Sequence, residues 1–101
     1  MIGRLDGKTA WVTGAGRGIG RSIALAMAGA GASLGLSSRT VEELDAVADE
    51  IALAGGKAFA VTADALSLDS TLAAASAIAD SLGTIDILVN NAGGGVSPRR
   101  D

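Results

Sequence analysis

The stretch Thr13-Gly14-Ala15-Gly16-Arg17-Gly18-Ile19-Gly20 decides how the rest of the chain can fold. It follows the apolar run 10–12 and precedes a helical pattern, which predicts a tight turn from a strand into the start of a helix. Such a turn presents backbone N–H groups without helical partners, and the helix dipole adds partial positive charge. Both properties favour an anion such as a pyrophosphate. Glycine suits the turn because a Cβ would block close backbone approach and would penalise a positive φ.

The glycines of this turn follow the spacing G-x-x-x-G-x-G, at Gly14, Gly18 and Gly20. The common dinucleotide fingerprint G-x-G-x-x-G does not fit, since Ile19 or Arg21 would occupy the place of its third glycine. The P-loop pattern does not fit either, because Arg21 follows Gly20 where a lysine is required. Taken alone, a glycine turn is weak evidence, and the alternative is a plain strand-to-helix connection that binds no ligand.

Composition sets the class of protein. The 101 residues suit one small domain, carry a net charge of −3, and include neither cysteine nor histidine. The negative charge gives no electrostatic case for nucleic acid. Without cysteine there are no disulfides or thiolate metal ligands, and without histidine the commonest metal ligand is missing, so we expect no metal and a cytoplasmic location. Residues 1–6 do not resemble a signal peptide, and no apolar run has membrane-spanning length.

Apolar runs and helical patterns alternate along the chain. Strands are predicted at 8–13, 32–38, 57–63 and 85–89, although Gly35 weakens the second. Helices are predicted from Gly18 to about 29, after Thr40 to about 54, and from about 68 to 82. A capping box of Thr40 with Glu43 and a Ser67 cap are expected at two helix starts. The predicted apolar stripes include Ile19, Ile23, Met27 and Ala30 in the first helix and Leu68, Leu72, Ala75, Ile78 and Leu82 in the third.

This alternation predicts an α/β fold with a parallel sheet and right-handed crossovers. In such sheets the ligand crevice lies outside the carboxyl ends of the strands. Four segments fall at those ends: the glycine turn, the pair Ser38-Arg39, Asp64, and the run Asn90-Asn91-Ala92-Gly93. Their convergence on one edge predicts a nucleotide site. Asp64 and the asparagines are equally consistent with residues that only form turns through side-chain hydrogen bonds.

The end of the second predicted strand bears on cofactor choice. An NAD-preferring site places Asp or Glu about 20 residues after the glycine motif, where it hydrogen-bonds the ribose 2′-hydroxyl. Counted from Gly18, that position is the neutral Ser38, and Arg39 follows it. Guanidinium groups bind phosphate with paired hydrogen bonds, and Arg17 supplies a second cation. NADP is therefore expected rather than NAD, with Arg39 as a solvated loop charge being the alternative.

These segments resemble the N-terminal half of the short-chain dehydrogenase/reductase family, over nearly the whole chain. The resemblance rests on Thr13-Gly14-x-x-x-Gly18-x-Gly20, on Asp64 and on Asn90-Asn91-Ala92-Gly93. It implies a Rossmann-type doubly wound parallel sheet, here with its first four strands in the order 3-2-1-4. It also implies hydride exchange between a nicotinamide cofactor and an alcohol or carbonyl substrate. The glycine turn would hold the pyrophosphate, Asp64 would contact the adenine amino group, and Asn90 to Gly93 would line the adenosine side and steady the sheet. The predicted cofactor-binding residues are Thr13, Gly14, Arg17, Gly18, Ile19, Gly20, Ser38, Arg39, Asp64, Ala65, Asn90, Asn91, Ala92 and Gly93.

The chain departs from the family in its catalytic residues. The family uses a serine and a Tyr-x-x-x-Lys pair on later elements, but this sequence has no tyrosine, and its lysines are Lys8 and Lys57. The family's catalytic asparagine would fall beyond Asp101. We therefore expect residues 1–101 to be a partial dinucleotide-binding domain cut after the fourth strand, without catalytic residues and inactive alone. The full-length protein is expected to be a homo-oligomer that takes a small alcohol or carbonyl substrate.

Two other functions fit parts of the sequence. A non-catalytic module could bind a nucleotide for regulation or assembly. A methyltransferase-like domain is less suited, because that class would place an acidic residue after the second strand, where this chain has Ser37-Ser38-Arg39.

Overall fold

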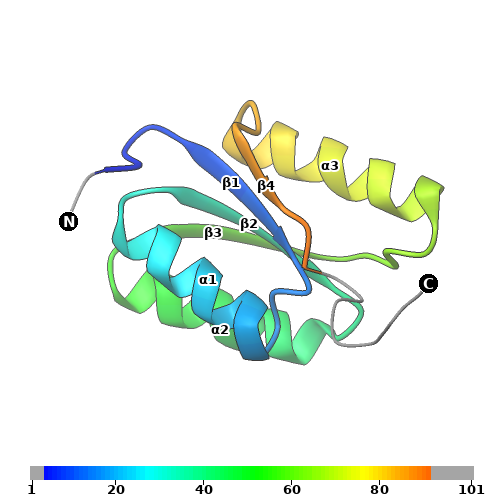
Figure 1. Cartoon of the computed structure of the whole chain (residues 1–101), viewed down its shortest axis with the longest axis horizontal. Coiled ribbons are helices and arrows are strands. Elements are labelled where there is room, and N and C mark those ends of the chain that lie inside the picture. Colours follow the sequence, from blue (N-terminus) through cyan, green and yellow to red (C-terminus); the bar gives the residue numbers. More distant parts are fainter. Residues whose placement is uncertain (1–3, 92–101) are drawn as a thin grey trace.

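Four parallel strands form the centre of the fold, in the order β3-β2-β1-β4 (Figure 1). The computed structural model describes residues 4–91. This sheet confirms the predicted α/β topology and its 3-2-1-4 order. The strands are β1 (Thr9–Thr13), β2 (Ser33–Ser38), β3 (Lys57–Thr62) and β4 (Ile87–Val89).

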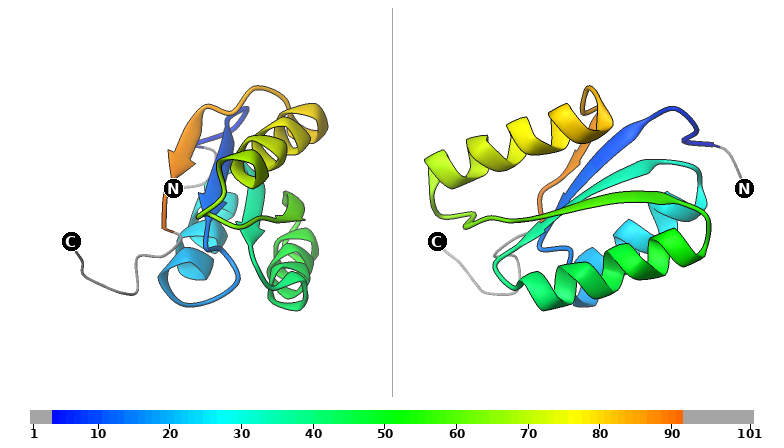
Figure 2. Two further views of the ribbon diagram at one scale, coloured as in Figure 1. Left: turned by 90° about the vertical axis from the view of Figure 1, so that its right-hand side faces the viewer. Right: turned by 180° about the vertical axis from the view of Figure 1, so that it is seen from behind.

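Helices cover both faces of the sheet, as a doubly wound fold requires. The helices α1 (Gly18–Gly29) and α2 (Val41–Leu53) lie on one face, and α3 (Leu68–Leu82) lies on the other (Figures 1 and 2). The left view of Figure 2 looks at the edge where the strands end and shows the three layers side by side. The connections from β1 to β2 and from β2 to β3 pass over one face of the sheet, and the connection from β3 to β4 passes over the opposite face.

The central strand β1 is buried on both faces. All five of its residues are buried, as its continuous apolar run predicts. Val12 lies in the larger core cluster with residues of α2 such as Leu44 and Ile51, whereas Trp11 lies in the smaller cluster with Ile78 of α3. The strand that leads into the glycine turn is therefore packed against helices on both faces of the sheet.

Gly35 has a packing role in the middle of β2. It pairs with Trp11 on one side and Phe59 on the other, so the strand is continuous despite the glycine. A Cβ at Gly35 would lie 2.6 Å from Ile78 Cγ2. The missing side chain thus lets α3 approach the sheet closely.

The fourth strand is shorter than predicted, at Ile87–Val89 rather than 85–89. The carboxylate of Asp86 accepts a hydrogen bond from the backbone N–H of Thr9 at 2.8 Å, in the place that a strand carbonyl would take. The paired register with β1 therefore begins at Ile87, opposite Ala10.

Two predicted helix faces are partly wrong. Ile19 is 72% exposed, because α1 turns Gly20 and Ala24 to the core instead. Adjacent helical residues point about 100° apart, so a helix that faces the sheet with Gly20 turns Ile19 outward. In α3, Ile78 is buried as predicted, but Leu68 and Leu72 are 72% and 57% exposed.

The two predicted caps have different outcomes. Ser67 caps α3 as expected, since its side chain accepts a hydrogen bond from the N–H of Ser70 at 3.2 Å. Thr40 occupies the N-cap position of α2, but its side chain makes no capping hydrogen bond, so the capping box is wrong. The hydroxyl of Ser38 accepts from the Thr40 N–H instead, and Glu43 turns towards the glycine turn.

Candidate functional site

The glycine turn has the backbone that its sequence predicts. Gly14 and Gly18 have φ angles of 64° and 60°, in the region that favours glycine. A Cβ at Gly20 would collide with the carbonyl oxygen of Gly14 and would lie 2.7 Å from Nδ2 of Asn91. The turn is therefore closed by direct contact between the backbone of Gly14 and the first turn of α1.

The start of α1 is open to an anion. Its N-cap residue is Arg17, whose side chain makes no capping hydrogen bond, and its first turn holds no acidic residue. The first backbone hydrogen bond into the helix runs from the N–H of Arg21 to the carbonyl of Arg17, at 3.3 Å. The N–H groups of residues 18–20 precede it, so no helical carbonyl is available to accept from them.

The ends of β1 and β4 are joined by side-chain hydrogen bonds. Oγ1 of Thr13 accepts from the N–H of Asn91 at 2.8 Å and lies 3.2 Å from Oδ1 of Asn90. The amide Nδ2 of Asn91 donates to the carbonyl of Gly14 at 3.2 Å. The two asparagines therefore fasten the end of β4 to the end of β1 and to the glycine turn, which are far from them in the sequence.

The end of β2 brings together charges from three segments. Ser38 lies beside the glycine turn, and Arg39 is exposed and forms no ion pair with any residue from 4 to 91. Arg17 of the turn lies 4.0 Å from Oε2 of Glu43, measured from its NH1. No sequence pattern indicated Glu43 as a residue of this site, because its spacing from Thr40 predicted a helix cap.

Asp64 shapes the loop between β3 and α3. Its Oδ1 accepts from the N–H of Leu66 at 2.9 Å, and its own N–H donates to the hydroxyl of Ser70 at 2.9 Å. The Oδ2 atom has no such partner within residues 4–91, and the side chain is exposed. Asp64 thus forms a turn, and its exposed side chain follows the carboxyl end of β3.

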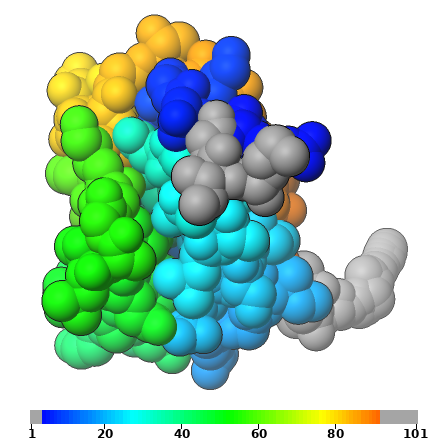
Figure 3. Space-filling view, turned by 90° about the vertical axis from the view of Figure 1, so that its left-hand side faces the viewer, coloured from blue at the N-terminus to red at the C-terminus, as the bar shows by residue number. Residues whose placement is uncertain are grey.

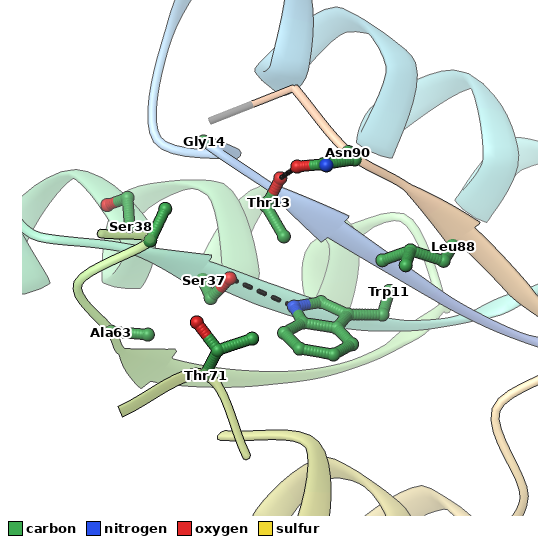
Figure 4. Close-up of a pocket in the computed structure, with 10 residues that line it drawn as sticks. Trp11, Thr13, Gly14, Ser37, Ser38, Ala63, Thr71, Leu88 and Asn90 are labelled. Atoms are coloured by element: carbon green, nitrogen blue, oxygen red, sulfur yellow. Dashed lines mark hydrogen bonds between the residues drawn. The ribbon is translucent and has the colours of Figure 1, made fainter. Parts of the chain in front are cut away.

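A pocket of about 160 Å³ opens between the carboxyl ends of the strands and α3 (Figure 4). In its wall, the indole N–H of Trp11 donates to the hydroxyl of Ser37 at 2.9 Å, and both residues are buried. Five residues of the pocket were not predicted as site residues, namely Trp11, Ser37, Ala63, Thr71 and Leu88. Trp11 belongs to the apolar run 10–12, which predicted only a strand, and no motif indicated that the other four line a site. The pocket is lined by Trp11, Thr13, Gly14, Ser37, Ser38, Ala63, Ala65, Thr71, Leu88 and Asn90.

The structure places the described members of the predicted site at one edge of the sheet. The glycine turn, the Ser38-Arg39 pair, Asp64-Ala65 and Asn90-Asn91 all follow strand ends. Ala92 and Gly93 lie outside the described residues. Lys8 and Lys57 adjoin the starts of β1 and β3, which is the opposite edge. Figure 3 faces that edge, where the segments from α1 into β2 (cyan) and from α2 into β3 (green) lie side by side.

Residues 4–91 contain neither a metal-binding cluster nor a membrane-spanning helix. No group of three or more acidic, cysteine or histidine residues there could hold a metal ion. No helix of the described part is long and apolar enough to cross a membrane.

The strand order, the glycine turn at the start of α1 and the polar residues at the strand ends define a Rossmann-type domain. A sequence profile of the short chain dehydrogenase family matches residues 8–101. The chain belongs to this family of oxidoreductases.

Relatives within the family are similar over most of this chain. The 7alpha-hydroxysteroid dehydrogenase of Escherichia coli K12 is 50% identical over 92 residues, which cover 91% of this chain and 36% of that protein. A solved 7alpha-hydroxysteroid dehydrogenase, complexed with NADH and 7-oxo glycochenodeoxycholic acid, is 49% identical with a TM-score of 0.89, covering 92% of this chain and 36% of that one. A metagenomic short-chain oxidoreductase in complex with NADP is 42% identical with a TM-score of 0.78, covering 83% and 38%. The chain therefore spans little more than a third of these relatives, which include proteins solved with either nicotinamide cofactor.

Proposed function

We propose that this chain is the nucleotide-binding part of an oxidoreductase that transfers hydride between NADP(H) and an alcohol or carbonyl substrate. Membership of the short-chain dehydrogenase family supports the reaction class. The observation that carries the choice of NADP is the end of β2, where Ser38 and Arg39 replace the acidic residue of an NAD site.

The residues at the carboxyl edge fit a dinucleotide. A Cβ placed on Gly18 would meet nothing within 4 Å, so open space adjoins the turn where backbone N–H groups begin α1. Those N–H groups would hold the pyrophosphate, with Gly14, Ile19 and Gly20 completing the turn. The bound nicotinamide would supply the hydride chemistry. The role of this chain would be to bind and orient the nucleotide.

The two arginines would recognise the 2′-phosphate. Arg39 has no ion-pair partner among residues 4–91, and the Arg17 side chain is 85% exposed, so both guanidinium groups can reach a ligand. A phosphate forms charge-assisted, often bidentate hydrogen bonds with arginine. An acidic residue at position 38 would repel that phosphate, and the neutral Ser38 avoids this repulsion.

The adenosine end would lie along the loops after β3 and β4. Oδ2 of Asp64 would accept from the adenine amino group, beside Ala65, while Asn90 would face the ribose. Thr13 and Asn91 would act indirectly, because their hydrogen bonds hold the turn to β4. Ala92 and Gly93 stay predicted members of this subsite.

The test is Arg39→Ala in the purified protein, with separate dissociation constants for NADPH and NADH. Loss of a charge-assisted contact of about 1.5–3 kcal/mol would weaken NADPH binding on the order of 10- to 100-fold and leave NADH binding nearly unchanged. Lys57→Ala is the control, since it removes one positive charge at the opposite edge of the sheet. An equal loss of affinity for both cofactors would contradict the assignment of NADP.

A non-catalytic nucleotide-binding module is the second candidate. The glycine turn and the polar residues at the strand ends support it as well, because they would bind a nucleotide in either case. A panel of alcohols and carbonyls with NADP(H), run on a full-length protein that contains this chain, separates the two candidates, because only an oxidoreductase turns over. The small alcohol or carbonyl substrate, the homo-oligomeric state and the cytoplasmic location stay predictions.

A further inference from the structure

Glu43 lies directly against the glycine turn, although it belongs to a different element. A Cβ built on Gly16 would lie 2.9 Å from Cβ of Glu43, 3.0 Å from its Oε1 and 3.3 Å from Oγ of Ser38. The first turn of α2 therefore brings a carboxylate to the junction of the glycine turn with the end of β2. The absence of a side chain at Gly16 makes room for it.

The carboxylate of Glu43 is also the ionic neighbour of Arg17. Oε2 of Glu43 lies 4.0 Å from NH1 of Arg17, at the outer limit of an ion pair. The Glu43 side chain is 36% exposed, whereas that of Arg17 is 85% exposed. The acid is thus fixed by packing on the turn, and the arginine is the partner that is free to move.

We propose that Glu43 is a specificity-determining residue, which competes with the nucleotide 2′-phosphate for Arg17. This inference rests on the proposed function, because it assigns a 2′-phosphate to the Ser38–Arg39 edge. Without the phosphate, the guanidinium of Arg17 lies near the carboxylate, at 4.0 Å. A bound 2′-phosphate draws the guanidinium away and leaves Glu43 unpaired beside the new negative charge. Nucleotides without that phosphate do not compete and are unaffected by Glu43.

The effect is expected to be a modest tuning of preference. A long, largely exposed ion pair contributes little in water, so its removal changes binding only slightly. The direction of the change in affinity is nevertheless definite. The carboxylate of Glu43 repels the 2′-phosphate and attracts Arg17, so removal of its charge strengthens binding of the phosphate. Glu43 thus offsets part of the preference for NADP that Ser38 and Arg39 create.

The test compares Glu43→Gln with Glu42→Gln in the purified protein. Gln keeps the size of Glu43 and its contact with Gly16, and Glu42 is an exposed acid in the same first turn of α2. The probes are adenosine 2′,5′-bisphosphate and 5′-AMP, which differ only by the 2′-phosphate, and calorimetry gives both dissociation constants. Thermal unfolding of each variant is recorded alongside.

E43Q is expected to tighten binding of the bisphosphate by about two- to fivefold and to leave 5′-AMP unchanged. E42Q is expected to change the ratio of the two constants less than E43Q does. In an Arg17→Ala background, the gain from E43Q is expected to disappear, since the competition runs through Arg17.

Three results would overturn the inference alone, provided that both probes bind the unmodified protein. These are no change or a loss of bisphosphate affinity in E43Q, an equal gain in E42Q, and a full gain from E43Q in the R17A background. If neither probe binds the unmodified protein, the proposed function fails and this inference falls with it.

Discussion

The side-chain amide of Asn91 donates a hydrogen bond to the backbone carbonyl of Gly14 at 3.2 Å, across 77 residues of chain. The same carbonyl is the atom that a Cβ at Gly20 would strike. One oxygen atom thus lies where the end of β4, the end of β1 and the start of α1 converge. The shape of the glycine turn depends on all three segments.

Asn91→Ala should loosen this junction. It removes the amide donor and leaves the Gly14 carbonyl without that partner, at an expected cost of about 1–2 kcal/mol in the free energy of unfolding. Binding of NADPH should weaken as well, because the turn that would hold the pyrophosphate is no longer fixed. Denaturant unfolding and a binding titration measure the two effects. Unchanged values in both would show that the hydrogen bond is dispensable.

Gly20→Ala should destabilise the protein by about 1–3 kcal/mol, the range for forcing extra atoms into a packed site. The new methyl group would collide with backbone, which cannot rotate away as a side chain can. Gly29→Ala is the matched control at the other end of α1, where a Cβ meets nothing within 4 Å. The control should be neutral or stabilise by up to about 1 kcal/mol, since alanine is the better helix former. Similar effects of the two variants on the unfolding midpoint would contradict the close contact.

Gly35→Ala should also destabilise the fold, through a different neighbour. Its methyl group would press on Ile78, with the cost of about 1–3 kcal/mol expected for overpacking. Ile78→Ala alone should cost about 2–5 kcal/mol by leaving a cavity. In the double variant the new methyl group partly fills that cavity, so the combined loss should be smaller than the sum. Additive losses in a double-mutant cycle would show that the two sites do not interact.

The 101-residue chain alone should not catalyse hydride transfer. Acid–base catalysis at a carbonyl needs a positioned group of suitable pKa, and this sequence contains no tyrosine, while Lys8 and Lys57 adjoin the opposite edge of the sheet. Oxidation of NADPH with a panel of carbonyl compounds should match a buffer blank and a Gly18→Trp control. Turnover above both would show that another residue of this chain donates the proton.

The sequence predicted what depends on local chemistry. Ser67 caps α3 because a serine before a helical run finds its partner three residues away. The glycine positions were predictable because positive φ and close approach exclude other residues. The alternation of elements gave the parallel sheet, and the family resemblance gave its order.

What the sequence did not predict depends on contacts between distant segments. The expected capping box is absent, and its Glu43 instead lies against Gly16 and near Arg17 of the glycine turn, which is far from it in the sequence. In α1, rich in alanine and glycine, periodicity does not distinguish one apolar stripe from its neighbour. The close contact of Gly20 with Gly14 determines which side of α1 faces the sheet, and Ile19 therefore points outward.

The indole of Trp11, which donates a hydrogen bond to Ser37, gives the chain an intrinsic fluorescent probe. Trp11 is the single tryptophan of a sequence without tyrosine, so the intrinsic ultraviolet fluorescence comes almost entirely from one indole. That ring is 6% exposed and lines the pocket at the carboxyl edge. Its emission should therefore respond to events at that pocket, and its overlap with the absorption of a reduced nicotinamide allows energy transfer to be followed without any attached label.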